Sequence, residues 1–152
     1  MTRKEKAVEL FMNGANCAQA VAGAFADLMG MTEGAAMRLS SGFGGGVARQ
    51  REVCGAVSGM VMVASALYGY DALDDDAVKA AHYRLIRTLC DTFRERWGSI
   101  VCRELVGAKK SADTVPEPDP RTAEYYRQRP CAALVGTAAE ILEKYITENP
   151  VF

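Results

Sequence analysis

The residues of this 152-residue chain with the widest range of chemistry are its five cysteines. The gaps between them are 37, 36, 12 and 29 residues, which excludes a CxxC pair and a CxxCH haem-attachment site. A cysteine thiolate is the nucleophile of disulfide exchange and also the form that binds soft metals. The sequence therefore points to thiol redox chemistry, electron transfer or metal binding, at a site assembled from distant segments. The cysteines are Cys17, Cys54, Cys90, Cys102 and Cys131.

These chemistries place different demands on the fold. A dithiol couple needs two cysteines whose Cβ atoms lie about 3.8 Å apart, and one of them needs a depressed pKa. A [2Fe–2S] cluster needs four thiolates that converge from separate elements. Structural zinc sites typically use CxxC knuckles, which are absent here. We keep the dithiol couple and the iron–sulfur cluster as alternatives, with the couple as the first interpretation because long gaps suit reversible pairing.

Composition limits the function classes. The chain is 49% hydrophobic, enough for the core of a single domain over residues 1–152, and its net charge of −1 argues against a nucleic-acid partner. The N-terminal segment lacks the apolar region of a secretory signal. The longest apolar run, residues 53–70, is interrupted by glycine and serine and predicts a core helix rather than a membrane span. We expect a cytoplasmic protein, whose cysteines are ordinarily reduced.

The elements that position the cysteines are predicted to be helices. Good helix formers dominate and no alternating β-pattern appears, so we expect an all-α, single-domain bundle of six or seven helices. Asn16, Thr32 and Ser99 are candidate caps. Residues 108–121 hold three of the five prolines and predict an internal proline-rich loop. The helices are expected over residues 2–12, 17–29, 32–40, 53–70, 74–97, 99–107 and from 130 towards the end, with a partial helix over 122–128.

Four of the five cysteines fall at the starts of these predicted helices. Free amide donors and the helix dipole favour a thiolate there. Cys90 instead lies mid-helix beside an apolar stripe, where a free cysteine behaves as a small hydrophobic residue, so we assign it to packing. The candidate site, catalytic or metal-binding, is therefore Cys17, Cys54, Cys102 and Cys131.

Arginines lie near three of these four cysteines in the sequence. A cation lowers the pKa of a thiol when the two side chains approach each other. Because the chain has 12 arginines, proximity along the chain carries little weight by itself. The arginines concerned are Arg49, Arg51, Arg103 and Arg129.

Other candidate sites are weaker. The glycine run at residues 42–46 has no preceding strand and no GK[ST] sequence, so it predicts a turn that places Cys54 rather than a phosphate loop. His82, the only histidine, has no partner at metal-ligand spacing and is expected on a helix surface. Asp74-Asp75-Asp76 suits the start of a helix.

The order of the motifs resembles a known family. The segment Cys54-Gly55-Ala56-x-x-Gly59, preceded by Asn16-Cys17-Ala and followed by Cys102 and Cys131, is similar to the C_GCAxxG_C_C family of small redox-active proteins. The glycine loop before Cys54 is also similar. The resemblance implies that the family's four characteristic cysteines correspond to Cys17, Cys54, Cys102 and Cys131, and that Cys90 lies outside the motif.

The resemblance also implies cofactors and partners. The family is distantly similar to the iron–sulfur-bearing part of split-Soret cytochrome c, which would extend here only to a cluster site because no CxxCH is present. Its members tend to be encoded near transporter genes, which implies a redox partner or a transporter component as partner.

Small residues beside Cys54 have two interpretations. Gly55, Ala56 and Gly59 would leave room for a bound cofactor, and the GxxxG spacing of the two glycines permits close approach of another helix, including one from a second copy in a homodimer. Three hypotheses follow: a thiol oxidoreductase or electron-transfer protein; a soft-metal or sulfur-binding module without turnover that serves a transporter; and a structural helical domain.

Overall fold

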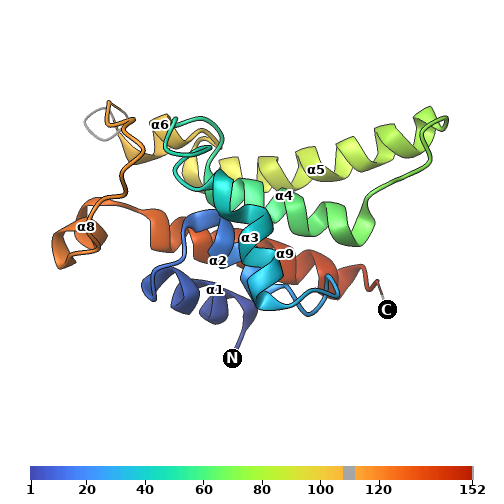
Figure 1. Cartoon of the computed structure of the whole chain (residues 1–152). Coiled ribbons are helices and arrows are strands. Elements are labelled where there is room, and N and C mark those ends of the chain that lie inside the picture. The colour runs from blue at the N-terminus through green and yellow to red at the C-terminus, as the bar shows by residue number, and fades with distance from the viewer. Residues whose placement is uncertain (108–111, 152) are drawn as a thin grey trace.

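Helices form the regular structure of residues 1–107 and 112–151, the part of the chain that the computed structural model describes. This part holds eight α-helices, six of them with eight or more residues, and no named strand, which confirms the all-α prediction. Figure 1 shows α8 at one end of the bundle and the α4–α5 connection at the other. The helices are α1 (Arg3–Met12), α2 (Cys17–Ala24), α3 (Glu33–Ser40), α4 (Gly55–Tyr68), α5 (Asp76–Trp97), α6 (Cys102–Val106), α8 (Ala123–Gln128) and α9 (Cys131–Glu148), with a short 3-10 turn η1 (Ser41–Phe43) after α3.

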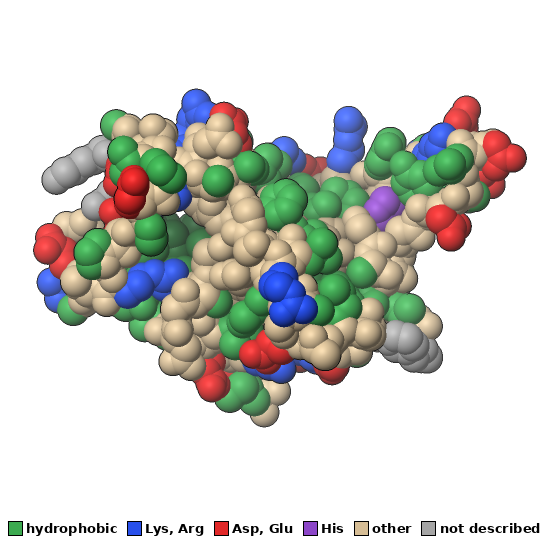
Figure 2. Space-filling view, viewed as in Figure 1, with side chains coloured by type: hydrophobic (Ala, Val, Ile, Leu, Met, Phe, Trp, Pro, Cys, Tyr) green, Lys and Arg blue, Asp and Glu red, His purple; other side chains and the backbone are tan. Residues whose placement is uncertain are grey.

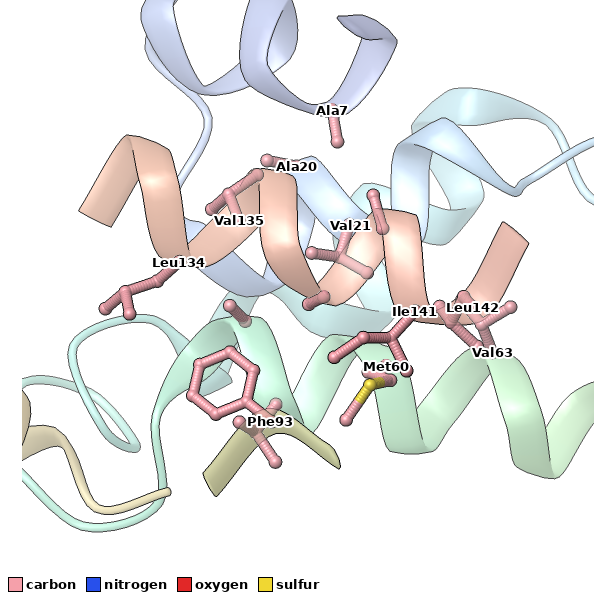
Figure 3. Packing of buried hydrophobic residues seen from close by; sticks show 14 of the residues in the cluster. Ala7, Ala20, Val21, Met60, Val63, Phe93, Leu134, Val135, Ile141 and Leu142 are labelled. Atoms are coloured by element: carbon pink, nitrogen blue, oxygen red, sulfur yellow. The ribbon is translucent and has the colours of Figure 1, made fainter. Parts of the chain in front are cut away.

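Helix α9 organises the core. It contacts α1, α2, α4 and α5, and its apolar face is almost wholly buried between them. In Figure 3, Leu134 and Ile141 of α9 lie among side chains of the other helices, including Met60 of α4 and Phe93 of α5. Because fully burying one such side chain contributes about 1.5–3 kcal/mol, this shared core holds the helices together. It fixes where the first residue of α9, Cys131, must lie.

Local capping matches the sequence for two of the three expected caps. The Asn16 side chain accepts a hydrogen bond from the Gln19 N–H at 2.9 Å, and the Gln19 side chain accepts one from the Asn16 N–H at 3.1 Å. Thr32 Oγ1 caps α3 by accepting from the Ala35 N–H. The third prediction is wrong: Ser99 Oγ accepts from the Val101 N–H, so the helix starts later, at Cys102.

The second helix is shorter than predicted. It ends at Ala24 rather than near residue 29, because the Phe25 N–H bonds the Ala22 carbonyl and the Ala26 N–H bonds the Gly23 carbonyl. These three-residue hydrogen bonds turn the chain more tightly than an α-helix does. The predicted proline-rich loop over 108–121 is free of helix and strand over residues 112–121, and residues 108–111 lie outside the described residues.

Helices α2 and α4 meet without intervening side chains. A Cβ atom on Gly55 would lie 3.1 Å from Cys17 Cβ, and one on Gly59 would lie 2.9 Å from the Ala18 carbonyl oxygen. The GxxxG spacing therefore serves a close contact within this chain. It brings the N-terminal end of α2 against the N-terminal end of α4. None of the described helices is both long and apolar enough to cross a membrane.

Substitution of Gly59 tests this contact. We expect Gly59→Ala to lower the free energy of unfolding by about 1–3 kcal/mol, because overpacking forces the two helices apart. Gly34→Ala is the control, since Gly34 is exposed on α3 and its added Cβ would meet only the end of the Arg38 side chain at 3.6 Å. Urea unfolding followed by circular dichroism measures the free energy of unfolding of both variants. Equal stability of the Gly59→Ala variant and the native chain would contradict the contact.

Candidate functional site

A cavity of about 300 Å³ lies at the end of the bundle that carries α8. It is bounded by the start of α2, residues 44–51, the 116–121 part of the loop and the start of α9. In Figure 2 the surface is hollowed between the loop and the body of the bundle. Three of the four predicted cysteines line this cavity, namely Cys17, Cys102 and Cys131. The fold thus gathers cysteines that are up to 114 positions apart in the sequence.

Cys17 and Cys131 both line the cavity, and each shifts the pKa of the other. Each is the first residue of its helix, α2 and α9, and all five cysteines carry free thiols. Hydrogen bonding from the Cys17 thiol lowers the pKa of Cys131 to about 7 against the effect of burial, and Arg129, Arg121 and Arg51 lower it further. The same interaction raises the pKa of Cys17, which keeps its proton. One thiolate and one thiol therefore face each other.

Cys54 and Cys102 are joined by a short antiparallel bridge between Val53 and Val101. The Cys54 N–H donates to the Ile100 carbonyl at 2.8 Å, and the Cys102 N–H donates to the Glu52 carbonyl at 2.6 Å. Cys102 reaches the cavity, whereas Cys54 is the buried N-cap residue of α4 and does not line it. Burial raises the pKa of Cys54 to about 12 and also raises that of Cys102. Both are protonated at neutral pH.

Four arginines and one aspartate also line the cavity. Asp119 pairs with Arg49 at 3.5 Å and with Arg129. Arg49 pairs in addition with Asp113, which lies outside the lining, at 2.9 Å. The remaining two arginines are Arg51 and Arg121.

Neither of these two has a carboxylate partner among the described residues. Arg121 donates to the carbonyls of Phe11 and Ala15 and lies over the Phe11 ring at 4.3 Å. Arg51 donates from Nε to the Asp113 carbonyl at 3.0 Å and has Nη1 3.9 Å from Cys102 Sγ. The lining is therefore rich in positive charge.

A strained segment holds two of these arginines in place. The backbone is left-handed from Gly45 to Arg49 and again at Arg51, with φ between 50° and 73°. Non-glycine residues avoid this region at a cost of about 1–2 kcal/mol each. Cross-loop hydrogen bonds maintain it, among them the Arg51 N–H to the Gly45 carbonyl at 3.1 Å. The glycine run therefore does more than place Cys54, because its coil turns Arg49 and Arg51 to the cavity.

The remaining predicted residues lie as follows. Gly55 lines the cavity, whereas Ala56 is buried in the core and Gly59 packs on α2. Cys90 is 8% exposed and belongs to the apolar core. His82 lies away from the cavity, with Nε2 3.2 Å from Ser65 Oγ.

Arg121, Asp119 and Tyr125 line the cavity, although no motif in the sequence indicates that they belong to the site. The signal in the sequence is that arginines flank several cysteines. Neighbours in the chain are not neighbours in the fold, however: Arg51, close to Cys54 in the sequence, has its side chain beside Cys102. The bridge between Val53 and Val101 brings these two segments together.

An iron–sulfur cluster needs four thiolates around one centre, and thiolates are suitable donors for iron. Across residues 1–107 and 112–151 no three Cys, His, Asp or Glu side chains converge to hold one ion, and Cys54 lies outside the cavity lining. The four motif cysteines nevertheless lie near one another, because a hydrogen bond with Cys131, burial, and the charges of Cys131, Cys54 and Cys102 all raise the pKa of Cys17. A cluster held by these thiolates therefore stays the alternative to the dithiol couple.

The fold and the cavity define a helical protein that gathers cysteines from distant helices at one recess. A family model described as "Putative redox-active protein (C_GCAxxG_C_C)" matches residues 15–145. The match covers most of the chain, so the chain belongs to this family, as its motifs predicted. No curated protein and no solved structure matches it.

The thiolate at Cys131 makes a pH-dependent prediction. Labelling of Cys131 by iodoacetamide should rise half-maximally near pH 7, because only the thiolate reacts and its pKa is lowered to about 7. Cys54 and Cys102 should stay unlabelled at that pH, since burial raises both pKa values. Site-resolved mass spectrometry across a pH series measures this.

A matched variant tests the cause of the shift. Thiols, guanidinium groups and one phenol act electrostatically on Cys131 or are affected by it. They are Cys17, Cys54, Cys102, Arg129, Arg121, Arg51 and Tyr125. Cys17→Ala removes the largest of the lowering effects and should move the labelling midpoint of Cys131 upward. Cys90→Ala should leave it unchanged. A native midpoint near the free-thiol value of about 8.5 would refute the assignment.

Proposed function

We propose that the chain is a thiol oxidoreductase whose reacting couple is Cys17 and Cys131. The observation that carries this proposal is that both side chains line one cavity, where each shifts the pKa of the other. Thiol–disulfide exchange requires an attacking thiolate and a neighbouring thiol that resolves the mixed disulfide. Cys131 supplies the first and Cys17 the second. The family's description as redox-active supports the same class of chemistry.

The proposed cycle transfers two electrons from the dithiol to a disulfide. The Cys131 thiolate attacks one sulfur of the substrate, the substrate S–S bond breaks, and one half leaves as a thiolate. That thiolate takes the proton of the Cys17 thiol. The Cys17 sulfur then attacks Cys131 Sγ, which forms the Cys17–Cys131 disulfide and releases the other half as a thiolate. The substrate disulfide is reduced, and the protein dithiol is oxidised.

The neighbouring groups have supporting roles in this proposal. The arginines stabilise the attacking thiolate and the leaving thiolate by charge. Cys102 is protonated and lines the cavity, so the site holds a further thiol beside the Cys17–Cys131 couple. Cys54 is behind the wall, where its backbone N–H anchors the bridge that carries Cys102.

Oxidation of the reduced chain with diamide tests the couple. We expect peptide mapping to find one disulfide, between Cys17 and Cys131, in the native chain and in the Cys54→Ala and Cys90→Ala variants. Cys17→Ser should stop this intramolecular disulfide and leave Cys131 open to mixed disulfides. Iron and zinc analysis of the same anaerobic sample serves as the control for metal. A stoichiometric metal content, or a principal disulfide that omits Cys131, would overturn the proposal.

A further inference from the structure

The arginines of the cavity carry more positive charge than the single Cys131 thiolate balances. Among the described residues of the lining, Asp119 is the only carboxylate, and Arg49 and Arg129 share it. Asp113, outside the lining, pairs with Arg49 as well. Figure 2 shows acidic side chains gathered at the far tip of the α4–α5 connection, at the opposite end of the molecule. These acids do not compensate the arginines of the cavity, because exposed charges farther apart than about 8–10 Å are largely screened.

Arg51 carries the clearest sign of a missing anion. Its side chain lines the cavity and is buried, with the residue 2% exposed. Nη2 has no hydrogen-bond partner among the described residues, and Nη1 has only the Cys102 sulfur at 3.9 Å. A buried guanidinium donor without an acceptor is costly, and an anion is its natural partner. The strained coil of residues 45–51 holds the side chain in this position.

A second arginine of the lining has a free donor as well. Arg129, 7% exposed, pairs through Nη2 with Asp119, but its Nε finds no acceptor among the residues described. In the chain, only Pro130 separates Arg129 from the reacting Cys131. Two buried donors therefore lie on the walls that hold the three sulfurs.

The reach of the cysteines limits the size of the reactant. Cys102 and Cys131 are 6% and 7% exposed, on the wall of a cavity of about 300 Å³. A small reactant enters such a recess more readily than a disulfide on the surface of a folded protein, although Cys17 is only half-buried. A small molecule of roughly ten to fifteen heavy atoms fits a pocket at the lower end of the usual range for ligand sites.

From the arginine-rich lining, the orphaned Arg51 donor and the recessed sulfurs we infer that the substrate of this site is a small anionic disulfide. This inference rests on the proposed Cys17–Cys131 couple and names its substrate class. One carboxylate or comparable anionic group of the substrate accepts hydrogen bonds from Arg51. Its S–S bond then lies at Cys131 for the exchange described above, in which the substrate is reduced to one thiol and one thiolate and the protein couple is oxidised to the disulfide.

The test uses the native chain and three disulfides of similar size and different charge. Dithiodipropionate carries two carboxylates, its bis-amide is neutral, and cystamine carries two ammonium groups. The single-turnover rate of Cys17–Cys131 disulfide formation is measured for each, and divided by the rate of the urea-unfolded chain with the same reagent to remove intrinsic reactivity. We expect the dianion to be favoured over the neutral amide by about tenfold or more, as one charge-assisted hydrogen bond implies.

Variants of two arginines assign the preference to the site. Arg51→Gln should remove most of the preference for the dianion, and Arg51→Lys should retain part of it, since Lys keeps the charge without the fork of donors. Arg127→Gln is the matched control, because Arg127 is exposed on α8 and does not line the cavity. If Arg51→Gln fails to fold, the comparison of the three reagents on the native chain still tests whether the site prefers an anionic disulfide.

The outcomes separate this inference from the proposed function. Oxidation of the Cys17–Cys131 couple at equal normalised rates by all three reagents, or fastest by cystamine, would overturn the anionic substrate and leave the couple standing. A folded chain that forms no Cys17–Cys131 disulfide with any of them would overturn both. A preference for the dianion that survives Arg51→Gln unchanged would overturn the role of Arg51.

Discussion

The structure depends on the close contact of α2 with α4. Because Gly55 and Gly59 have no side chains, the two helices approach until backbone meets backbone, and the first residue of α2 lies against the start of α4. Helix α9 then packs across both, and its first residue, Cys131, lines the same cavity as Cys17 and Gly55. A side chain on either glycine would force α4 away from α2 and disturb the packing at this end of the bundle.

Electrostatics complements this packing. Burying a guanidinium group away from water is expensive unless an anion lies nearby, and a thiolate in an apolar recess is equally unfavourable without a cation or a donor. In this cavity the two costs are reduced together, because the Cys17 thiol and the arginines stabilise a thiolate on Cys131. The compensation is incomplete: the charge that remains on Arg51 is available for a ligand. The excess of positive charge thus lowers the pKa of Cys131 and favours the anionic substrate that we propose.

Backbone strain is concentrated where the charge is concentrated. Val47, Ala48, Arg49 and Arg51 adopt left-handed conformations that ordinary residues avoid. Strain of this kind persists only where surrounding hydrogen bonds over-determine the conformation, and it clusters at functional sites. Here the tight coil turns Arg49 and Arg51 inward while the next residues, from Glu52 to Cys54, run extended to the bridge with residues 100–102. One segment therefore connects the arginines, the buried Cys54 and the cavity-lining Cys102.

Helix periodicity and capping residues sufficed to predict the all-α class, the start of α2 at Cys17 and the start of α9 to within one residue, because these depend on residues close together in the chain. The order of the cysteine motifs sufficed to predict the family. The end of α2 and the start of α6 were misplaced, since tight turns and side-chain bonding of Ser99 override propensity. The tertiary structure alone decided that Cys54 lies outside the cavity and that Arg121 and Asp119 line it. It also decided that the Arg51 side chain lies beside Cys102. These facts depend on contacts across tens of residues, made by packing and by one backbone bridge, and spacing along a chain carries no information about them.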